Sequence, residues 1–393
     1  MKIWPEWREG RAIVVEVRRP SAAWDAGLRA GWEVLAIDGV PIAEATRTRR
    51  PSALSEEDRE AAGWALLAVL SGRHGAARAL SVRAADGATR SISIPAATAT
   101  NDDEPLTFRL LDDNRGYIAI RSFAQPDLVE RFDRALDALR TTRGLVIDVR
   151  NNGGGNTALA RPIMGRFIQT RKQYAWMSRR AGRQMAPRWP EFVEPRGPWT
   201  YTPPVVVLVN HWSASMAEGF PMGMHGIGRA TIVGTPMMGL GAGVIDVVLG
   251  WTQIPLQVSA EPVFHVDGTP RWRLRPDVLV DVTQPSADDD PIRAPAYVYW
   301  LMATERRNAD AAKSLLGRER LDVLVDPVEP CGDCRQRSGP TGSGGDRCPL
   351  PSRPTSMPNT RPGLTSLDSS SETAFTTRTE RSPSGTFPTR ARR

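Results

Sequence analysis

The sequence is poor in lysine, in cysteine and in long apolar runs. Of its 51 basic residues only three are lysine (Lys2, Lys172 and Lys313), so few positions can supply a lysine general base. Residues 1–330 contain no cysteine, which excludes a disulfide-stapled fold there. No window approaches 18 consecutive apolar residues, so we expect no membrane-spanning helix.

Metal and nucleic-acid sites are not predicted either. The three cysteines, Cys331, Cys334 and Cys348, lack a fourth cysteine or histidine nearby, so free thiols are favoured over zinc and we expect no cofactor. The formal net charge of +7 is concentrated in residues 331–393, which hold ten arginines against five acidic residues. Because this excess lies in a Ser, Thr, Pro and Gly-rich tail, it does not indicate a folded nucleic-acid surface.

The length of 393 residues, with 40% hydrophobic and 24% charged residues, allows two or three domains. The first residues contain no apolar run of signal-peptide length, so the chain as written shows no export signal. The tail at 331–393 has too few large apolar residues to offset the entropy of ordering, and we expect it to be disordered. A helical pattern at 296–318 predicts a helical segment over residues 286–330.

Residues 10–98 show the pattern of a small sheet-and-helix domain. Residues 11–18 and Val34–Ile37 are predicted strands, and Asp38-Gly39 predicts a tight hairpin after the second. Apolar spacing over residues 57–73 predicts a helix, and Leu80–Ile94 predicts two further strands around a turn.

Within this domain, the sequence PSAAWDAGLRAGWEVLAIDGVPI at residues 20–42 resembles bacterial PDZ domains, with Trp32 where that family usually has Asp. PDZ domains bind an extended peptide at a sheet edge and capture its terminal carboxylate in a Gly-rich loop. That loop should precede the strand at residue 12, where little chain remains. A PDZ-like fold without peptide binding therefore stays open as an alternative.

A second domain is predicted over residues 105–285, after a polar linker at 99–105. Strand and helix patterns alternate there, and this alternation predicts an α/β core with its chemistry in loops that follow strands. The expected strands are 117–120, 145–149 and 205–209, and apolar spacing predicts helices at 128–139 and 159–167.

Two loops in this domain are candidates for chemistry. The glycines after Asn152 offer unobstructed backbone N–H groups of the kind that stabilise an oxyanion, although many such turns only reverse the chain. Ser215 follows a buried strand and starts a predicted helix, where the helix dipole favours developing negative charge. An isolated serine there is equally a plain N-cap.

Taken together, the motifs resemble the carboxyl-terminal processing, or tail-specific, serine proteases. The matching segments are GYIAIRSF at 116–123, DVRNNGG at 148–154, SASMAE at 213–218, GRATIVG at 228–234 and PDV at 276–278. The resemblance implies a ClpP/crotonase-like core joined to a PDZ-like domain, with Ser215 as the nucleophile. It also implies an oxyanion hole made by the N–H of Met216 with that of Gly153 or Gly154.

The catalytic base of that family is missing from its usual place. Relatives carry a lysine in a G-K-G segment, and Leu240 stands there in this chain. In the tricorn-like branch a histidine comes from the G-Y-I-H-I strand, where this chain has Ala119. Neither residue accepts a proton, so the family's dyad cannot operate in its usual form.

His265 is the best replacement base that the sequence offers. It lies in a predicted strand before a Gly turn, and Asp267 or Glu261 could orient its ring. A surface histidine is the ordinary alternative. His225 should lie about 15 Å from Ser215 along the helix.

Lys172 lies among charged residues, so we expect it to be solvated. Glu218 lies within one helical turn of Ser215, and we expect it to support the loop.

Two functions follow from these patterns. The first is a serine endopeptidase that hydrolyses polypeptides through an acyl-enzyme on Ser215. The second is a non-enzymatic peptide-binding protein on the same scaffold. The resemblance places either protein in the periplasm or at the cell surface, with a polypeptide as its partner, and does not indicate an oligomeric state.

Overall fold

The structure is a computed structural model that describes residues 2–55, 58–73, 75–96, 104–111 and 114–283. The helical segment predicted for 286–330 and the tail at 331–393 lie outside the described residues. Within the described part, no helix combines the length and the apolar character needed to cross a membrane.

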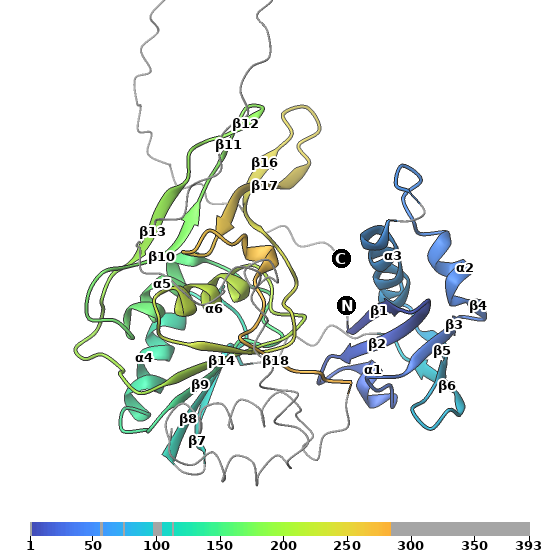
Figure 1. Ribbon diagram of the computed structural model, residues 1–393, viewed down its shortest axis with the longest axis horizontal. Helices are drawn as coiled ribbons and strands as arrows, with labels where there is room; N and C mark the ends of the chain where they lie inside the picture. Colours follow the sequence, from blue (N-terminus) through green and yellow to red (C-terminus); the bar gives the residue numbers. More distant parts are fainter. Residues whose placement is uncertain (1, 56–57, 74, 97–103, 112–113, 284–393) are drawn as a thin grey trace, which may run out of the picture. The chain divides into compact units, whose positions relative to one another are not determined.

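The N-terminal part is built on one antiparallel sheet with the strand order β1-β2-β3-β5-β6, in which β4 also pairs with β3 (Figure 1). Its elements are β1 Ile3–Arg8, β2 Arg11–Val17, α1 Ala22–Asp25, β3 Glu33–Ile37, β4 Val40–Pro41, α2 Ile42–Arg47, α3 Arg59–Ser71, β5 Arg78–Arg83 and β6 Thr89–Ile94. Asp38 and Gly39 both adopt positive φ, at 50° and 81°, as the predicted tight turn between β3 and β4 requires.

Strand β1 was not expected from the sequence. It pairs antiparallel with β2 from Ile3 to Arg8 and also packs against α3, where the indole N–H of Trp7 donates to the carbonyl of Ala62 at 3.2 Å. Its interior Pro5 obscured the strand pattern, although an edge strand tolerates proline. The chain itself therefore fills the edge of β2.

The second part is centred on a sheet with the order β18-β15-β14-β9-β8-β7, parallel except for the β7–β8 pair. These strands are β7 Leu106–Leu111, β8 Arg115–Ile120, β9 Leu145–Asp148, β14 Val205–Val209, β15 Thr231–Gly234 and β18 Val278–Leu279. The predicted α/β core is confirmed.

Alternate residues of these strands enter two different apolar clusters. Val205, Val207 and Val209 face the larger cluster with the helices α4 Leu128–Ala138, α5 Thr157–Gly165 and α6 Met216–Gly226. Val206 and Leu208 face a smaller cluster on the other side of the sheet. The continuous valine run at 205–209 is explained by burial on both faces.

A four-stranded antiparallel sheet, ordered β13-β10-β17-β16, lies across α5 and α6 from the core sheet (Figure 1). Its strands are β10 Lys172–Met177, β13 Trp189–Val193, β16 Ala242–Val248 and β17 Pro255–Phe264; the short β11 Arg180–Ala181 and β12 Gln184–Met185 and the 3-10 helix η2 Arg271–Arg273 accompany them.

Helix α6 is buried between these layers, and its glycines permit the close packing. A Cβ at Gly223 would lie 2.6 Å from the sulfur of Met164, and one at Gly226 would lie 3.0 Å from the carbonyl oxygen of Tyr174. The glycines that lower the intrinsic stability of this helix therefore allow it to approach α5 and β10.

Candidate functional site

Ser215 stands between strand β14 and helix α6. The chain leaves β14 at Val209, crosses a buried loop at 210–214 and enters α6 at Met216. Ser215 has φ 54° and ψ −115°, a strained conformation for a residue with a Cβ. The surrounding contacts must hold it there, which is a common feature of residues at functional sites.

Glu218 supplies the most direct of these contacts. Its carboxylate accepts hydrogen bonds from the backbone N–H groups of Ser215 at 2.7 Å, Gly239 at 2.7 Å and Leu240 at 3.0 Å. Burial raises the pKa of Glu218 to about 7, although Arg271 and the three N–H groups favour the charged form. Glu218 thus binds the backbone on both sides of the site, and its supporting role stays a prediction.

The glycine loop lies directly against the serine. A Cβ on Gly154, whose φ is +102°, would stand 2.7 Å from both the Cβ of Ser215 and the carbonyl oxygen of Ala214. The N–H of Gly154 donates to the side-chain oxygen of Asn152 at 2.8 Å, and its carbonyl accepts from the N–H of Phe123 at 2.9 Å. Only glycine fits this position.

The hydrogen bonds of Gly154 limit which backbone N–H groups are available to form an oxyanion hole. The N–H of Gly154 is already engaged, whereas no acceptor for the N–H of Gly153 is found among the described residues. Met216 is the first residue of α6, where backbone N–H groups have no partner within the helix. Of the two glycines that the sequence left open, Gly153 is therefore the better donor.

A cavity of about 260 Å³, called here the Ser215 cavity, opens beside the nucleophile candidate. Its polar lining residues are Asn156, Thr157, Tyr174, Ser215, Glu261 and Arg271. Arg271 donates to the carbonyl of Leu240 at 2.7 Å, and Glu261 pairs with Arg179 at 2.8 Å. Burial raises the pKa of Tyr174 to about 12, so this phenol is a poor base at neutral pH.

The structure does not bring His265 to Ser215. The ring of His265 is buried at the opposite end of α6, with Nε2 3.0 Å from Nδ1 of His225 and Nδ1 3.0 Å from Asp267. The 11 residues of α6 separate the two sites by about 16 Å. Asp267 orients the ring as expected, but toward His225, whose own pKa is raised by a hydrogen bond to Asp277.

The lysines give no substitute within the described part of the chain. Lys172 donates to the carbonyl of Ile227 at 3.0 Å, just beyond the C-terminal end of α6, and Lys2 belongs to the N-terminal part. Leu240, which by the family resemblance is expected where relatives carry a lysine, is 46% exposed and is bound through its N–H to Glu218. Neither lysine nor histidine occurs among the described residues that line the Ser215 cavity.

Glu16 of β2 connects the N-terminal part to the loop that precedes Ser215. Its carboxylate contacts Nδ1 of His211 at 2.6 Å and accepts from the side chains of Asn210 at 3.2 Å and Thr235 at 3.2 Å. Trp4 stacks on the His211 ring with centroids 4.6 Å apart. This contact was not predicted, because its residues are far apart in the chain.

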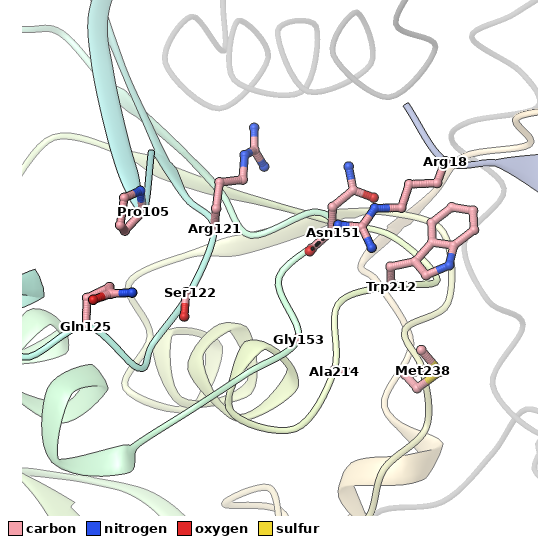
Figure 2. A pocket seen from close by; sticks show the side chains of 10 residues that line it. All are labelled: Arg18, Pro105, Arg121, Ser122, Gln125, Asn151, Gly153, Trp212, Ala214 and Met238. Carbon is pink, nitrogen blue, oxygen red and sulfur yellow. Dashed lines mark hydrogen bonds between the residues drawn. The ribbon is translucent and has the colours of Figure 1, made fainter. Parts of the chain in front are cut away.

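A larger cavity of about 480 Å³, called here the Arg18–Arg121 cavity, is lined in part by residues of the same two loops (Figure 2). It is lined by Arg18, Pro105, Arg121, Ser122, Gln125, Asn151, Gly153, Trp212, Ala214 and Met238. Neither arginine was predicted as a site residue. Arg121 lies within the matching segment at 116–123, but the family resemblance assigns no role to this arginine. Arg18 lies in the N-terminal part, outside the segments that match the protease family.

Arg121 is held by a buried acidic residue. It donates to Asp148 at 3.3 Å, and Arg150 donates to the same carboxylate at 2.8 Å. Burial alone would raise the pKa of Asp148, but the two guanidinium groups hold it well below its usual range. Among the described residues, no cluster of three or more His, Cys, Asp or Glu side chains is arranged to hold a metal ion.

Known proteins resemble this chain in sequence and in fold. Residues 114–280 match the family described as Peptidase family S41. The carboxy-terminal processing protease CtpA of Bacillus subtilis (strain 168) is 25% identical over 238 residues, which are 60% of this chain and 46% of that protein. The chain thus spans about half the length of this curated relative.

Solved structures share the fold. The crystal structure of mature CPAF has a TM-score of 0.56 at 15% identity, covering 79% of this chain and 83% of that chain. Mature CPAF complexed with lactacystin has a TM-score of 0.52 at 14% identity, covering 80% of this chain and 83% of that chain.

Proposed function

Since residues 114–280 belong to peptidase family S41, we propose that this protein is a serine endopeptidase of the carboxyl-terminal processing type. The observation that carries the proposal is the position of Ser215. It lies at the N-terminus of α6, strained at positive φ, against Gly154 and beside a cavity of about 260 Å³.

The reaction would follow from these positions. The Ser215 hydroxyl attacks the scissile carbonyl carbon. The resulting oxyanion accepts hydrogen bonds from the N–H groups of Met216 and Gly153 at the positive end of the α6 dipole. Collapse breaks the peptide C–N bond, the amine leaves with a proton, and an acyl-enzyme remains on the serine oxygen. Water then hydrolyses this ester and restores the hydroxyl.

Glu261 is the group to which we assign the acceptance of the serine proton. It is the one carboxylate among the described residues that line the Ser215 cavity. Its partner Arg179 has a side chain that is 64% exposed, so the pair can open at little cost. Glu261→Gln should lower the rate of Ser215 acylation at least tenfold, with Glu191→Gln as a control that removes a carboxylate outside this cavity.

The N-terminal part, predicted as a PDZ-like domain over residues 10–98, is proposed to support the catalytic loop. Because β1 fills the edge of β2, a peptide could add there only by displacing β1. The contacts of Glu16 with His211 and Asn210 instead link this part to the segment that ends at Ser215. By family resemblance, the protein would act in the periplasm or at the cell surface on polypeptides.

A second function, a peptide-binding protein that has lost hydrolysis, is favoured by one observation. Leu240 stands where relatives carry the catalytic lysine, and no lysine or histidine lines the Ser215 cavity within the described residues.

Digestion of an unfolded polypeptide, followed by mass spectrometry of the products, separates the two functions. The endopeptidase should release fragments that are absent with Ser215→Ala and unchanged with Ser91→Ala, a control on the exposed strand β6. Fragments of equal yield from Ser215→Ala, or none from the unaltered chain, would favour the second function.

A further inference from the structure

The Arg18–Arg121 cavity is cationic on its described surface. Two guanidinium groups line it together with polar side chains, and none of its described lining residues is acidic (Figure 2). Asp148, which pairs with Arg121, is fully buried and does not line the cavity. The nearby carboxylate of Glu16 is held by His211, Asn210 and Thr235 and is not part of the lining either.

The two arginines are anchored on one short loop. Arg121 donates to the carbonyl oxygen of Arg150 at 2.8 Å, and Arg18 donates to the next carbonyl oxygen, that of Asn151, at 3.3 Å. Because these carbonyls belong to consecutive residues, both guanidinium groups are bound to the same short segment. The two hydrogen bonds orient the guanidinium groups.

The cavity also lies close to the point of attack. Its lining includes Gly153 and Ala214, which immediately precede Gly154 and Ser215. The Ser215 cavity is lined by Gly155 and by Ser215 itself.

The two cavities are therefore lined by neighbouring residues of the same glycine loop and the same serine loop.

We propose that the Arg18–Arg121 cavity binds a carboxylate of the polypeptide substrate close to the scissile bond. The carboxylate is either an acidic side chain or the free C-terminus, since a guanidinium group recognises both in the same way. The proposal rests on the proposed function, because it takes Ser215 as the point of attack, and it identifies the substrates as polypeptides with negative charge close to the scissile bond.

The test is peptide binding to the full chain carrying Ser215→Ala, which does not require catalysis. Fluorescent peptides of one sequence are compared as free acid and amide, and amidated peptides are compared with Glu or Gln at each position. We expect a carboxylate to tighten binding about tenfold to a hundredfold, in line with charge-assisted hydrogen bonds of about 1.5–3 kcal/mol. A preference confined to the free acid identifies the C-terminus, and one confined to Glu identifies a side chain.

Variants then locate the site. Arg18→Gln should abolish the carboxylate preference and leave the affinity for the neutral peptides unchanged, whereas Arg18→Lys should retain part of it. Arg90→Gln removes the same charge from an exposed pair with Asp86 and should change nothing. Arg121→Gln provides a second variant in the cavity, and thermal unfolding of each variant checks that it is folded.

Equal affinity for charged and neutral peptides, or an equal loss in Arg18→Gln and Arg90→Gln, would overturn the proposal, as would absence of peptide binding. If the peptides show a carboxylate preference but a probe does not acylate Ser215 of the unaltered chain, the binding site is upheld and the protease function is contradicted. Acylation of Ser215 without any carboxylate preference would do the reverse.

Discussion

Gly154 and Ser215 are in such close contact that a methyl group cannot be placed between them. A Cβ on Gly154 would stand 2.7 Å from the Cβ of Ser215, at a φ of +102° that residues with side chains rarely adopt. The glycine loop thereby limits where the serine can lie, and Glu218 holds the same serine through its backbone N–H. Ser215 is positioned from two sides before any substrate arrives.

Gly154→Ala should therefore disturb the serine. The strained φ and the overlap with Ser215 together cost about 2–5 kcal/mol, and the rate of Ser215 acylation should fall at least tenfold. Urea unfolding and labelling with an active-site probe measure the two effects.

Gly153→Ala is the matched control, because a Cβ there meets nothing within 4 Å and the N–H is kept. Its stability should stay within about 1 kcal/mol of the unaltered chain. Equal losses in both variants would contradict the account of the Gly154 contact.

Glu218 should make stability depend on pH. Burial raises its pKa from 4.5 to about 7 in the folded chain, so its stabilising contribution is fully present below pH 4.5 and is lost as pH rises through 7. The free energy of unfolding should fall by up to about 3 kcal/mol from this group.

Glu218→Gln removes that titration. Urea unfolding between pH 4.5 and 8.5 should show a smaller fall for the variant than for the unaltered chain, and the difference between the two curves isolates Glu218. If the free energy of unfolding fell equally with pH in both proteins, burial would not raise the pKa of Glu218.

Leu240→Lys should speed acylation. Leu240 is 46% exposed, so a lysine fits there without entering the core, and the family resemblance predicts the base of relatives at this position. A positioned base contributes about a hundredfold or more to rate, and we expect at least a tenfold gain in probe labelling. Leu240→Met is the control of similar length without an amine, and an equal rate for both variants would contradict the view that a weak base limits the reaction.

His265→Gln should leave acylation nearly unchanged. The ring contacts His225 and Asp267 at the end of α6 opposite to Ser215, so its loss removes a buried hydrogen bond worth about 1 kcal/mol and no catalytic group. Probe labelling and thermal unfolding of His265→Gln check this. A loss of labelling with unchanged stability would indicate that His265 does act as the base.

Much of the core was predictable because its signals are local. The valine run at 205–209 and the apolar spacing from Leu128 to Leu136 each mark one element, and the structure places a strand and a helix there. The start of α6 at Ser215 was likewise predictable from a strand followed by a serine and a glutamate.

The residue that could accept the proton of Ser215 was not predictable, because its position next to Ser215 depends on which loops the fold brings together. His265 was expected within a strand but lies just after β17, and the packing of that strand on β10 places the histidine at the far end of α6. Glu261 lies four residues earlier and lines the Ser215 cavity instead. The contact between Glu16 and His211 joins residues that are nearly 200 positions apart in the chain. Sequence periodicity reports only on neighbouring positions, so it could not predict this contact.

The central claim is that Ser215 is the nucleophile, and covalent labelling tests it most directly. The full chain is treated with a fluorophosphonate probe, and the intact mass and the modified peptide are determined by mass spectrometry. We predict the addition of one probe, mapped to Ser215, with none on Ser215→Ala and normal labelling of Ser91→Ala. No label on the unaltered chain, or equal labelling of Ser215→Ala, would contradict it.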